Sequence, residues 1–260
     1  MSEPQRIHSR DNPLLKRLRS LSQDNTAYRR LGQFWIEGDH LCTALLARGG
    51  RPVQAVFSES AWERADMVLK RACERVVVVP DRLLAATSGL ESASSLGFLV
   101  DLPAAAGPLQ GAPTLVLDRL QDAGNVGSLL RSAAAFGFRQ VLAIRGTAAL
   151  WSPKVLRAAM GAHFALQLCE LLEPFDLKHL EVPLLVTSSH RGQWLHESVL
   201  PWPCAWVLGH EGQGVGSELE AMAGQSVRIA QPGGEESLNV AAAGAICLHA
   251  SAVSARLATG

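Results

Sequence analysis

The chain has 260 residues, of which 48% are hydrophobic and 18% charged, and its formal net charge is zero. This is the composition of a globular protein with room for two domains, each with its own core. No apolar run approaches the roughly 18 residues of a membrane helix, and the polar first residues lack the apolar core of a secretory signal. The sequence therefore predicts a cytoplasmic protein.

The cysteines show neither disulfide nor zinc spacing. They are an odd number, scattered through apolar stretches, and no two have C-x-x-C spacing: Cys42, Cys73, Cys169, Cys204 and Cys247. The eight histidines form no zinc pattern with them. We therefore expect free, buried thiols and no metal site.

Positive charge is concentrated near the N-terminus. Residues 1–31 carry a net charge of +4, which leaves −4 for the rest of the chain. The basic residues concerned include Arg10, Lys16, Arg17, Arg19, Arg29 and Arg30. Two interpretations stay open, a solvated helix face and an edge that contacts phosphates.

The first hundred residues alternate between helical and strand patterns. Leucines at helical spacing predict a helix over 12–23, and an apolar strand runs into a glycine-closed helix over 34–49. Strands are predicted at 53–58, at 75–80 and at the end of 90–103. Residues 1–102 thus read as a small α/β domain. The Pro-, Ala- and Gly-rich stretch 103–112 reads as a linker.

The remaining chain, 113–260, reads as a second α/β domain. Strands are predicted at 114–120 and 140–144, separated by a helix that starts after Asn125 and ends near Gly137, with further apolar runs at 182–189 and 204–212. This alternation implies a mostly parallel sheet with helices on both faces. Ligands of such sheets bind beyond the carboxyl ends of the strands.

Three segments at predicted strand exits combine glycines with polar side chains. They are residues 118–131, which contain "DAGNVGSLLR", then "LGHEGQGVG" at 208–216, and "IAQPGGEESLNVAAAGAICLHA" at 229–250. Glycine permits close approach of backbone to a ligand. Neither G-x-G-x-x-G nor a P-loop pattern occurs, which disfavours nicotinamide and nucleoside triphosphate cofactors.

In order and spacing, these segments resemble the three motifs of the SpoU (TrmH) branch of the SPOUT RNA methyltransferases. The resemblance covers 113–260, and residues 1–102 resemble the L30e-like substrate-binding domain that often precedes it. It implies an α/β SPOUT domain with a trefoil knot, a homodimer, S-adenosylmethionine as cofactor, and methylation of a ribose 2′-hydroxyl in rRNA or tRNA. The basic N-terminal residues would then contact RNA.

The resemblance also implies the site residues. The cofactor contacts would fall on Thr187, Leu208, Gly209, Gly214, Ile229, Ser237, Leu238 and Val240. The catalytic set would be Asn125, Arg131, Glu211 and Asn239. A non-catalytic RNA-binding protein on the same fold, and a SPOUT enzyme that methylates a base nitrogen, remain the alternatives.

Arg131 is the arginine of the first motif. On the predicted helix it shares a face with Gly127, Ser128 and Ala135, which leaves room for its guanidinium to bind a phosphate bidentately. The alternative is an ion pair with Glu211 or Asp122. In the family this arginine has been regarded as the base, but a guanidinium keeps its proton up to a pH above about 12. We expect Arg131 to orient the hydroxyl through the adjacent phosphate.

The other polar residues have structural alternatives. Asn125 is either a helix cap or a substrate contact, and Glu211 either orients Arg131 or Asn125 or is a plain loop carboxylate. Ser237 and Asn239 either bond the cofactor or cap a helix that starts near Val240. Lys154 and Arg157 are either RNA contacts or ordinary surface charges.

The sequence departs from the family pattern at several positions. Ala123 replaces the usual proline, His210 the usual asparagine, Ala159 and Ala241 frequent serines, and "IAQPGG" stands where I-P-M-x-G is common. His210 beside Glu211 is either a general base or an ordinary loop histidine.

Overall fold

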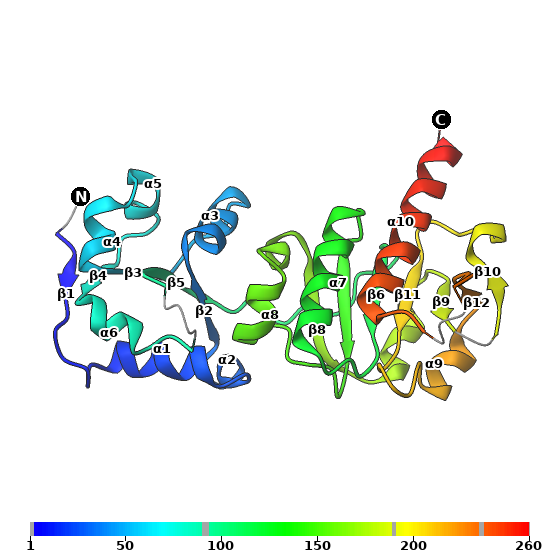
Figure 1. Cartoon of the computed structure of the whole chain (residues 1–260), viewed down its shortest axis with the longest axis horizontal. Helices are drawn as coiled ribbons and strands as arrows, with labels where there is room; N and C mark the ends of the chain where they lie inside the picture. Colours follow the sequence, from blue (N-terminus) through cyan, green and yellow to red (C-terminus); the bar gives the residue numbers. More distant parts are fainter. Residues whose placement is uncertain (1–2, 90–93, 189–190, 234–236, 260) are drawn as a thin grey trace. The chain divides into compact units, whose positions relative to one another are not determined.

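The computed structural model describes residues 3–89, 94–188, 191–233 and 237–259, and the chain divides into two compact units (Figure 1). The first unit comprises Met1–Ala104 and Trp151–Phe164, and the second comprises Ala105–Leu150 and Ala165–Gly260. The break at Ala104 falls inside the predicted linker. Residues 151–164, which the predicted boundaries assign to the second domain, instead group with the first unit.

A five-stranded mixed sheet forms the centre of the first unit, in the order β1-β4-β3-β5-β2. β1, β4 and β3 are parallel, whereas β5 is antiparallel to both β3 and β2. The strands are β1 (Gln5–Arg6), β2 (Gln33–Glu37), β3 (Gln54–Ser58), β4 (Val76–Val79) and β5 (Leu96–Asp101). The four predicted strands are confirmed as β2 to β5, while the two-residue β1 was not predicted.

Short helices cover this sheet. They are α1 (Pro13–Gln23), α2 (Ala27–Leu31), α3 (Asp39–Ala47), α4 (Glu59–Arg64), α5 (Met67–Lys70) and α6 (Asp81–Ala85). α1 starts where predicted, because Asn12 caps it by accepting a hydrogen bond from the Leu14 N–H and proline occupies the first helical position. Its leucines at 15, 18 and 21 are buried, which accounts for the helical spacing in the sequence.

The segment 151–164 completes the first unit's core. It contains α8 (Pro153–Ala158) and the start of the 3-10 helix η1 (Ala162–Ala165). The Trp151 ring packs on Phe34 of β2 at a centroid distance of 4.6 Å, and a Cβ at Gly161 would lie 2.7 Å from the Ala44 methyl. Aromatic burial on β2 explains why this segment groups with the first unit.

A seven-stranded sheet, parallel at every pairing described, forms the second unit, in the order β10-β12-β9-β11-β6-β7-β8. Its strands are β6 (Thr114–Leu117), β7 (Gln140–Ile144), β8 (Gln167–Leu172), β9 (Leu184–Thr187), β10 (Gln193–Trp194), β11 (Ala205–Leu208) and β12 (Gln225–Arg228). The central strands are almost wholly buried, as parallel strands covered on both faces should be.

Helices lie on both faces of this sheet. α7 (Ala123–Ala135) and α10 (Val240–Thr259) pack side by side on one face (Figure 1). On the other face, Val186 and Val207 pack with leucines of the 3-10 helix η2 (Pro174–His179) and of α9 (Ser217–Met222). A further 3-10 helix, η3, spans Leu195–Glu197. The predicted α/β fold with a parallel sheet is confirmed.

The start of α7 differs from the prediction. The helix begins at Ala123, not after Asn125, because the Asp122 carboxylate accepts a hydrogen bond from the Asn125 N–H at 2.7 Å and caps it. Asn125 therefore lies in the first turn.

All five cysteines are free, and only Cys73 is not buried. Within the described ranges no helix combines the length and hydropathy of a membrane span.

Candidate active site

The carboxyl ends of β9, β11 and β12 meet the residues before α10 around one large cavity in the second unit. Its volume is about 1190 Å³. Seven of the eight predicted cofactor residues line it: Thr187, Gly209, Gly214, Ile229, Ser237, Leu238 and Val240. Leu208 does not, because its side chain is fully buried in β11 and lies close to Gly244 of α10. Described residues of the second and third strand-exit segments thus line one cavity.

The loop after β11 folds back on its own first residue. A side chain at Gly209 would collide with the backbone of Gly214 and Val215, and Gly214 has φ +70°. Only glycine permits this approach. The second motif therefore needs its glycines for the loop conformation itself.

His210 stabilises the same loop through its ring. Its Nδ1 accepts hydrogen bonds from the backbone N–H groups of Gly212 at 3.0 Å and Gln213 at 3.2 Å. The Oδ1 of an asparagine makes this kind of local turn, so the histidine substitutes for the residue usual in the family. The structure supports the loop role of His210, because the nitrogen that accepts these bonds is engaged.

An ion pair after β6 holds this loop. Its two residues open the first strand-exit segment, but no role was predicted for them. Asp118 is 2% exposed and accepts a hydrogen bond from the Gly216 N–H at 2.7 Å. Arg119 binds Asp118 through Nε at 2.8 Å and Nη2 at 3.0 Å, and its Nη1 donates to Gln213 at 3.1 Å. The hydrogen bond to Asp118 raises the pKa of Arg119. The position of Asp118 directly after a buried strand was the available signal.

Three predicted catalytic residues form one hydrogen-bonded series. Asn125 Nδ2 donates to Glu211 Oε1 at 3.2 Å, and Asn125 Oδ1 accepts from Asn239 Nδ2 at 3.0 Å. Asn239 Oδ1 also accepts from the Ala241 and Ala242 N–H groups, so it caps α10 as well. The series joins all three motifs at the cavity, since both Glu211 and Asn239 line it.

Glu211 is held as a carboxylate. Partial burial raises its pKa, but hydrogen bonds from its own backbone N–H, from Asn125 and from the N–H groups of Asp122 and Gln121 lower it by more. The net pKa lies below the usual value for glutamate. Glu211 is therefore an acceptor at neutral pH and orients Asn125.

Arg131 lies exposed on α7. It makes no hydrogen bond or ion pair with any residue that the structure describes. The alternative ion pair with Glu211 or Asp122 is absent, because Glu211 accepts from Asn125 and Asp122 caps α7. The guanidinium is thus available to a ligand.

The predicted RNA-contacting residues lie in the first unit. Arg10 precedes α1, Lys16, Arg17 and Arg19 lie on α1, and Arg29 and Arg30 lie on α2. All are exposed except the half-buried Arg19. Their contacts are local: Lys16 lies 3.4 Å from Asp11, and Arg17 donates to Gln33 at 3.0 Å.

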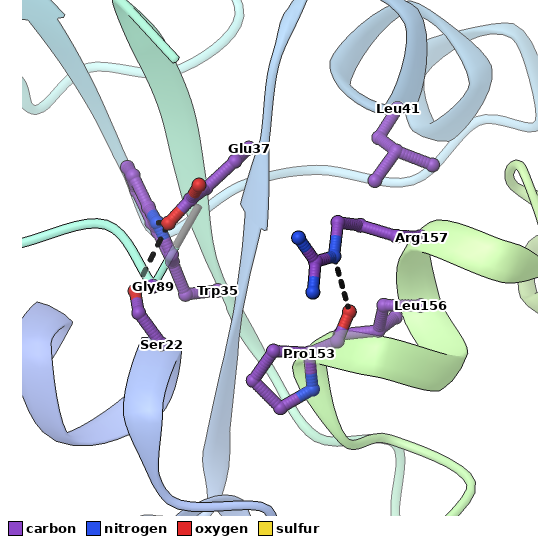
Figure 2. A pocket seen from close by; sticks show the side chains of 8 residues that line it. All are labelled: Ser22, Trp35, Glu37, Leu41, Gly89, Pro153, Leu156 and Arg157. Carbon is purple, nitrogen blue, oxygen red and sulfur yellow. Dashed lines mark hydrogen bonds between the residues drawn. The ribbon is translucent and has the colours of Figure 1, made fainter. Parts of the chain in front are cut away.

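A second cavity, in the first unit, is of a different kind (Figure 2). Glu37 accepts hydrogen bonds there from Ser22 at 3.0 Å, Trp35 at 2.9 Å and Ser88 at 2.8 Å, and Arg157 Nε donates to the Pro153 carbonyl at 3.3 Å. Its volume is about 20 Å³, room for about one water molecule. It is too small for a cofactor, and Glu37 is already satisfied by protein donors.

No cluster of three or more histidine, cysteine, aspartate or glutamate side chains suited to a metal occurs in the part of the chain that the structure describes.

A parallel α/β sheet with a glycine-loop cavity and a polar series at its strand ends is the arrangement of a cofactor-binding α/β enzyme. Residues 112–249 match the SpoU rRNA Methylase family. The chain is 32% identical over 254 residues to an uncharacterised tRNA/rRNA methyltransferase of Synechocystis, covering 94% of this chain and 92% of that protein. The chain therefore belongs to the SpoU rRNA methylase family.

Two further similarities concern a shorter match and a solved structure. A 23S rRNA (guanosine-2′-O-)-methyltransferase of Bordetella pertussis is 36% identical over 141 residues, which is 53% of this chain and 58% of that protein. The solved structure of an AdoMet-bound rRNA methyltransferase from Sinorhizobium meliloti superposes with a TM-score of 0.81 at 23% identity, covering 96% of this chain and 98% of that one. It shows that the two proteins share a fold.

Proposed function

We propose that this protein transfers a methyl group from S-adenosylmethionine to a ribose 2′-hydroxyl of rRNA or tRNA. The observation that carries the proposal is the series Glu211–Asn125–Asn239, which joins the three motifs beside one cavity. The 2′-O-methylation named for the Bordetella relative supports the choice of acceptor. Family membership supports RNA as the substrate.

The cavity fits the proposed cofactor. Its volume of about 1190 Å³ exceeds the roughly 300–1,000 Å³ of a typical ligand pocket, so a cofactor and part of a nucleotide have room together. Backbone groups of the tight loop at Gly209 and Gly214 face it, which suits a ligand held by main-chain hydrogen bonds. When bound, S-adenosylmethionine would supply a methyl group already activated on a sulfonium.

Because the methyl group is already activated, the protein's own residues need not form a covalent intermediate. They must position the acceptor oxygen, guide its proton away and exclude water. Arg131 keeps its proton, so it acts as a bidentate donor to the phosphate next to the reacting ribose, and that phosphate can relay the proton. Glu211 holds Asn125, and Asn125 with Asn239 forms the polar floor on which the ribose lies.

We assign RNA binding to the first unit, through the basic residues of α1 and α2. The L30e-like character of this unit, the trefoil knot of the second unit and a cytoplasmic location remain predictions.

We also propose that the protein is a homodimer through its second unit. The two large apolar residues Ile246 and Val253 are 41% and 40% exposed and lie seven positions apart on α10. This spacing places them on one helix face, and an exposed apolar stripe of this kind suits a second copy of the chain.

The test is methyl transfer from radiolabelled S-adenosylmethionine to unmodified rRNA and tRNA, followed by nuclease digestion and mass spectrometry. The expected product is a single 2′-O-methylated nucleoside. A methylated base would show that the chain acts on a base nitrogen. No transfer, together with no cofactor binding at millimolar concentration, would show a non-catalytic RNA-binding protein. Deleting the gene and mapping lost ribose methylations would identify the nucleotide.

A further inference from the structure

Gln231 lines the large cavity and has an unpaired hydrogen-bond acceptor. It lies two residues after Ile229, and both line the cavity. Its side-chain oxygen Oε1 is buried and has no hydrogen-bond partner among the residues that the structure describes. A buried acceptor without a donor destabilises the fold, and native proteins rarely keep one without a use.

Other polar side chains of the same wall are satisfied by the protein. Glu211 accepts from Asn125, Asn239 caps α10, and the His210 ring accepts from two backbone N–H groups. Glu220 accepts from Arg191 at 3.0 Å. Gln231 differs from these neighbours, which points to a partner that arrives with the ligand.

The inference rests on the cofactor proposed above. S-adenosylmethionine offers a charged ammonium on its methionine half, and an amino group and ribose hydroxyls on its adenosine half. The ammonium gains more from a carboxylate than from an amide oxygen, and the wall already contains Glu211 and Glu220. The neutral side-chain carbonyl of Gln231 is better matched to the neutral donors of the adenosine half, which are the amino group and the ribose hydroxyls.

We propose that the Gln231 side-chain carbonyl accepts a hydrogen bond from the adenosine half of the bound cofactor. The terminal torsion of the side-chain amide is soft, so the amide can turn toward the ligand, and Oε1 accepts no hydrogen bond from a described residue that this rotation would break. Where the family pattern has methionine, this chain has a strong acceptor. Gln231 is therefore a recognition residue particular to this sequence.

Calorimetric titration with S-adenosylhomocysteine, which has the same adenosine half and does not react, tests the role of Gln231. Gln231→Met should weaken binding by roughly 3- to 10-fold, the effect of one neutral hydrogen bond. Gln225→Met, the same substitution on β12 at a residue outside the cavity wall, should leave the Kd unchanged.

Thermal unfolding adds a readout that loss of structure would not produce. Without ligand, Gln231→Met should unfold at the wild-type temperature or above it, because the unpaired oxygen is gone. The temperature rise on adding S-adenosylhomocysteine should nevertheless be smaller than in wild type.

Analogues identify the donor. They carry an oxo group in place of the adenine amino group, or lack the 2′- or the 3′-hydroxyl. One of them should lose affinity for the wild type but not for Gln231→Met. An equal Kd for wild type and Gln231→Met overturns the role of Gln231 and leaves the cofactor assignment standing. If every analogue loses the same affinity for wild type as for Gln231→Met, the assignment to the adenosine half is overturned. If wild type does not bind S-adenosylhomocysteine at all, the proposed cofactor is overturned as well.

Discussion

Asn239 donates a hydrogen bond to Asn125 at 3.0 Å across 114 positions of the chain. Because Asn239 also caps α10 and Asn125 lies in the first turn of α7, this single contact fixes the starts of two neighbouring helices relative to each other. The contact lies at the edge of the proposed site, where the ribose would lie.

Two substitutions at Asn239 separate the cap from this contact. Asn239→Ala removes both and should lower the free energy of unfolding by about 1 kcal/mol. Asn239→Asp keeps an acceptor for the Ala241 N–H but places a carboxylate against Asn125 Oδ1. Rotating the Asn125 amide by half a turn would not relieve this repulsion, because it would place the Asn125 oxygen against the Glu211 carboxylate instead. Both variants should lose at least tenfold in methyl transfer, but only Asn239→Ala should lose stability.

Thermal unfolding and turnover measure the two effects. Asp66→Ala, which removes the cap of α5 in the first unit, is the matched control and should lower stability without changing turnover. Wild-type turnover in Asn239→Asp would show that the contact with Asn125 is not needed.

Arg131→Lys tests bidentate phosphate positioning. The substitution keeps the positive charge and loses the planar fork. We expect turnover to fall by at least tenfold, with the Kd for S-adenosylmethionine unchanged, because Arg131 is assigned to the RNA. The check is single-turnover methyl transfer alongside calorimetry of the cofactor. Near-normal turnover would rule out the bidentate role.

His210→Asn should be tolerated, whereas His210→Ala should not. Asparagine can accept the N–H groups of Gly212 and Gln213 in the same turn, but alanine leaves both without a partner and loosens the cavity loop. Calorimetry should give a wild-type Kd for His210→Asn and a several-fold weaker one for His210→Ala. If both variants bind normally but lose turnover together, the histidine acts in catalysis instead.

Glu211 makes the protein's stability depend on pH in one direction. Its pKa is lower in the folded state, so its contribution is fully present above the usual glutamate value of roughly 4.3 and is lost as the pH falls through the folded-state pKa. Denaturant unfolding of wild type and Glu211→Gln should differ more at pH 7 than at pH 3.5. A difference that does not change with pH would show that the carboxylate charge is not used.

Val253→Asp should dissociate the proposed homodimer, since a buried, unpaired carboxylate in an apolar interface is costly. Light scattering coupled to size exclusion would report a monomer for this variant. Val199→Asp is the control, because Val199 is 90% exposed and lies outside α10. A monomeric wild type would contradict the proposal directly.

The sequence was sufficient for the strands that carry the first two motifs, but β1, β8, β10 and β12 were not predicted. The predicted strands that end at Leu117, Thr187 and Leu208 are parallel neighbours, and carboxyl ends of parallel strands share one edge. The cap by Asn239 was also within reach, because asparagine before an apolar helix is a local signal.

Other contacts depend on conformations that no local pattern specifies. Arg119 has φ 59°, and the partners of the Asp118–Arg119 pair come from a loop almost a hundred residues away. The alternative ion pair of Arg131 with Glu211 was reasonable from charge alone, but the Glu211 carboxylate accepts a hydrogen bond from Asn125 instead. The packing of Trp151 on Phe34 likewise joins residues from the two predicted domains.

The packing of Trp151 on Phe34 has a consequence for synthesis on the ribosome. Domains generally fold as units, with the N-terminal one first, as the chain emerges. The first unit, however, includes residues up to Phe164, and β6, α7 and β7 are translated before its last segment. Its core therefore closes only after β6 and β7, two of the second unit's seven strands, have been made, and Phe34 stays uncovered by Trp151 until then.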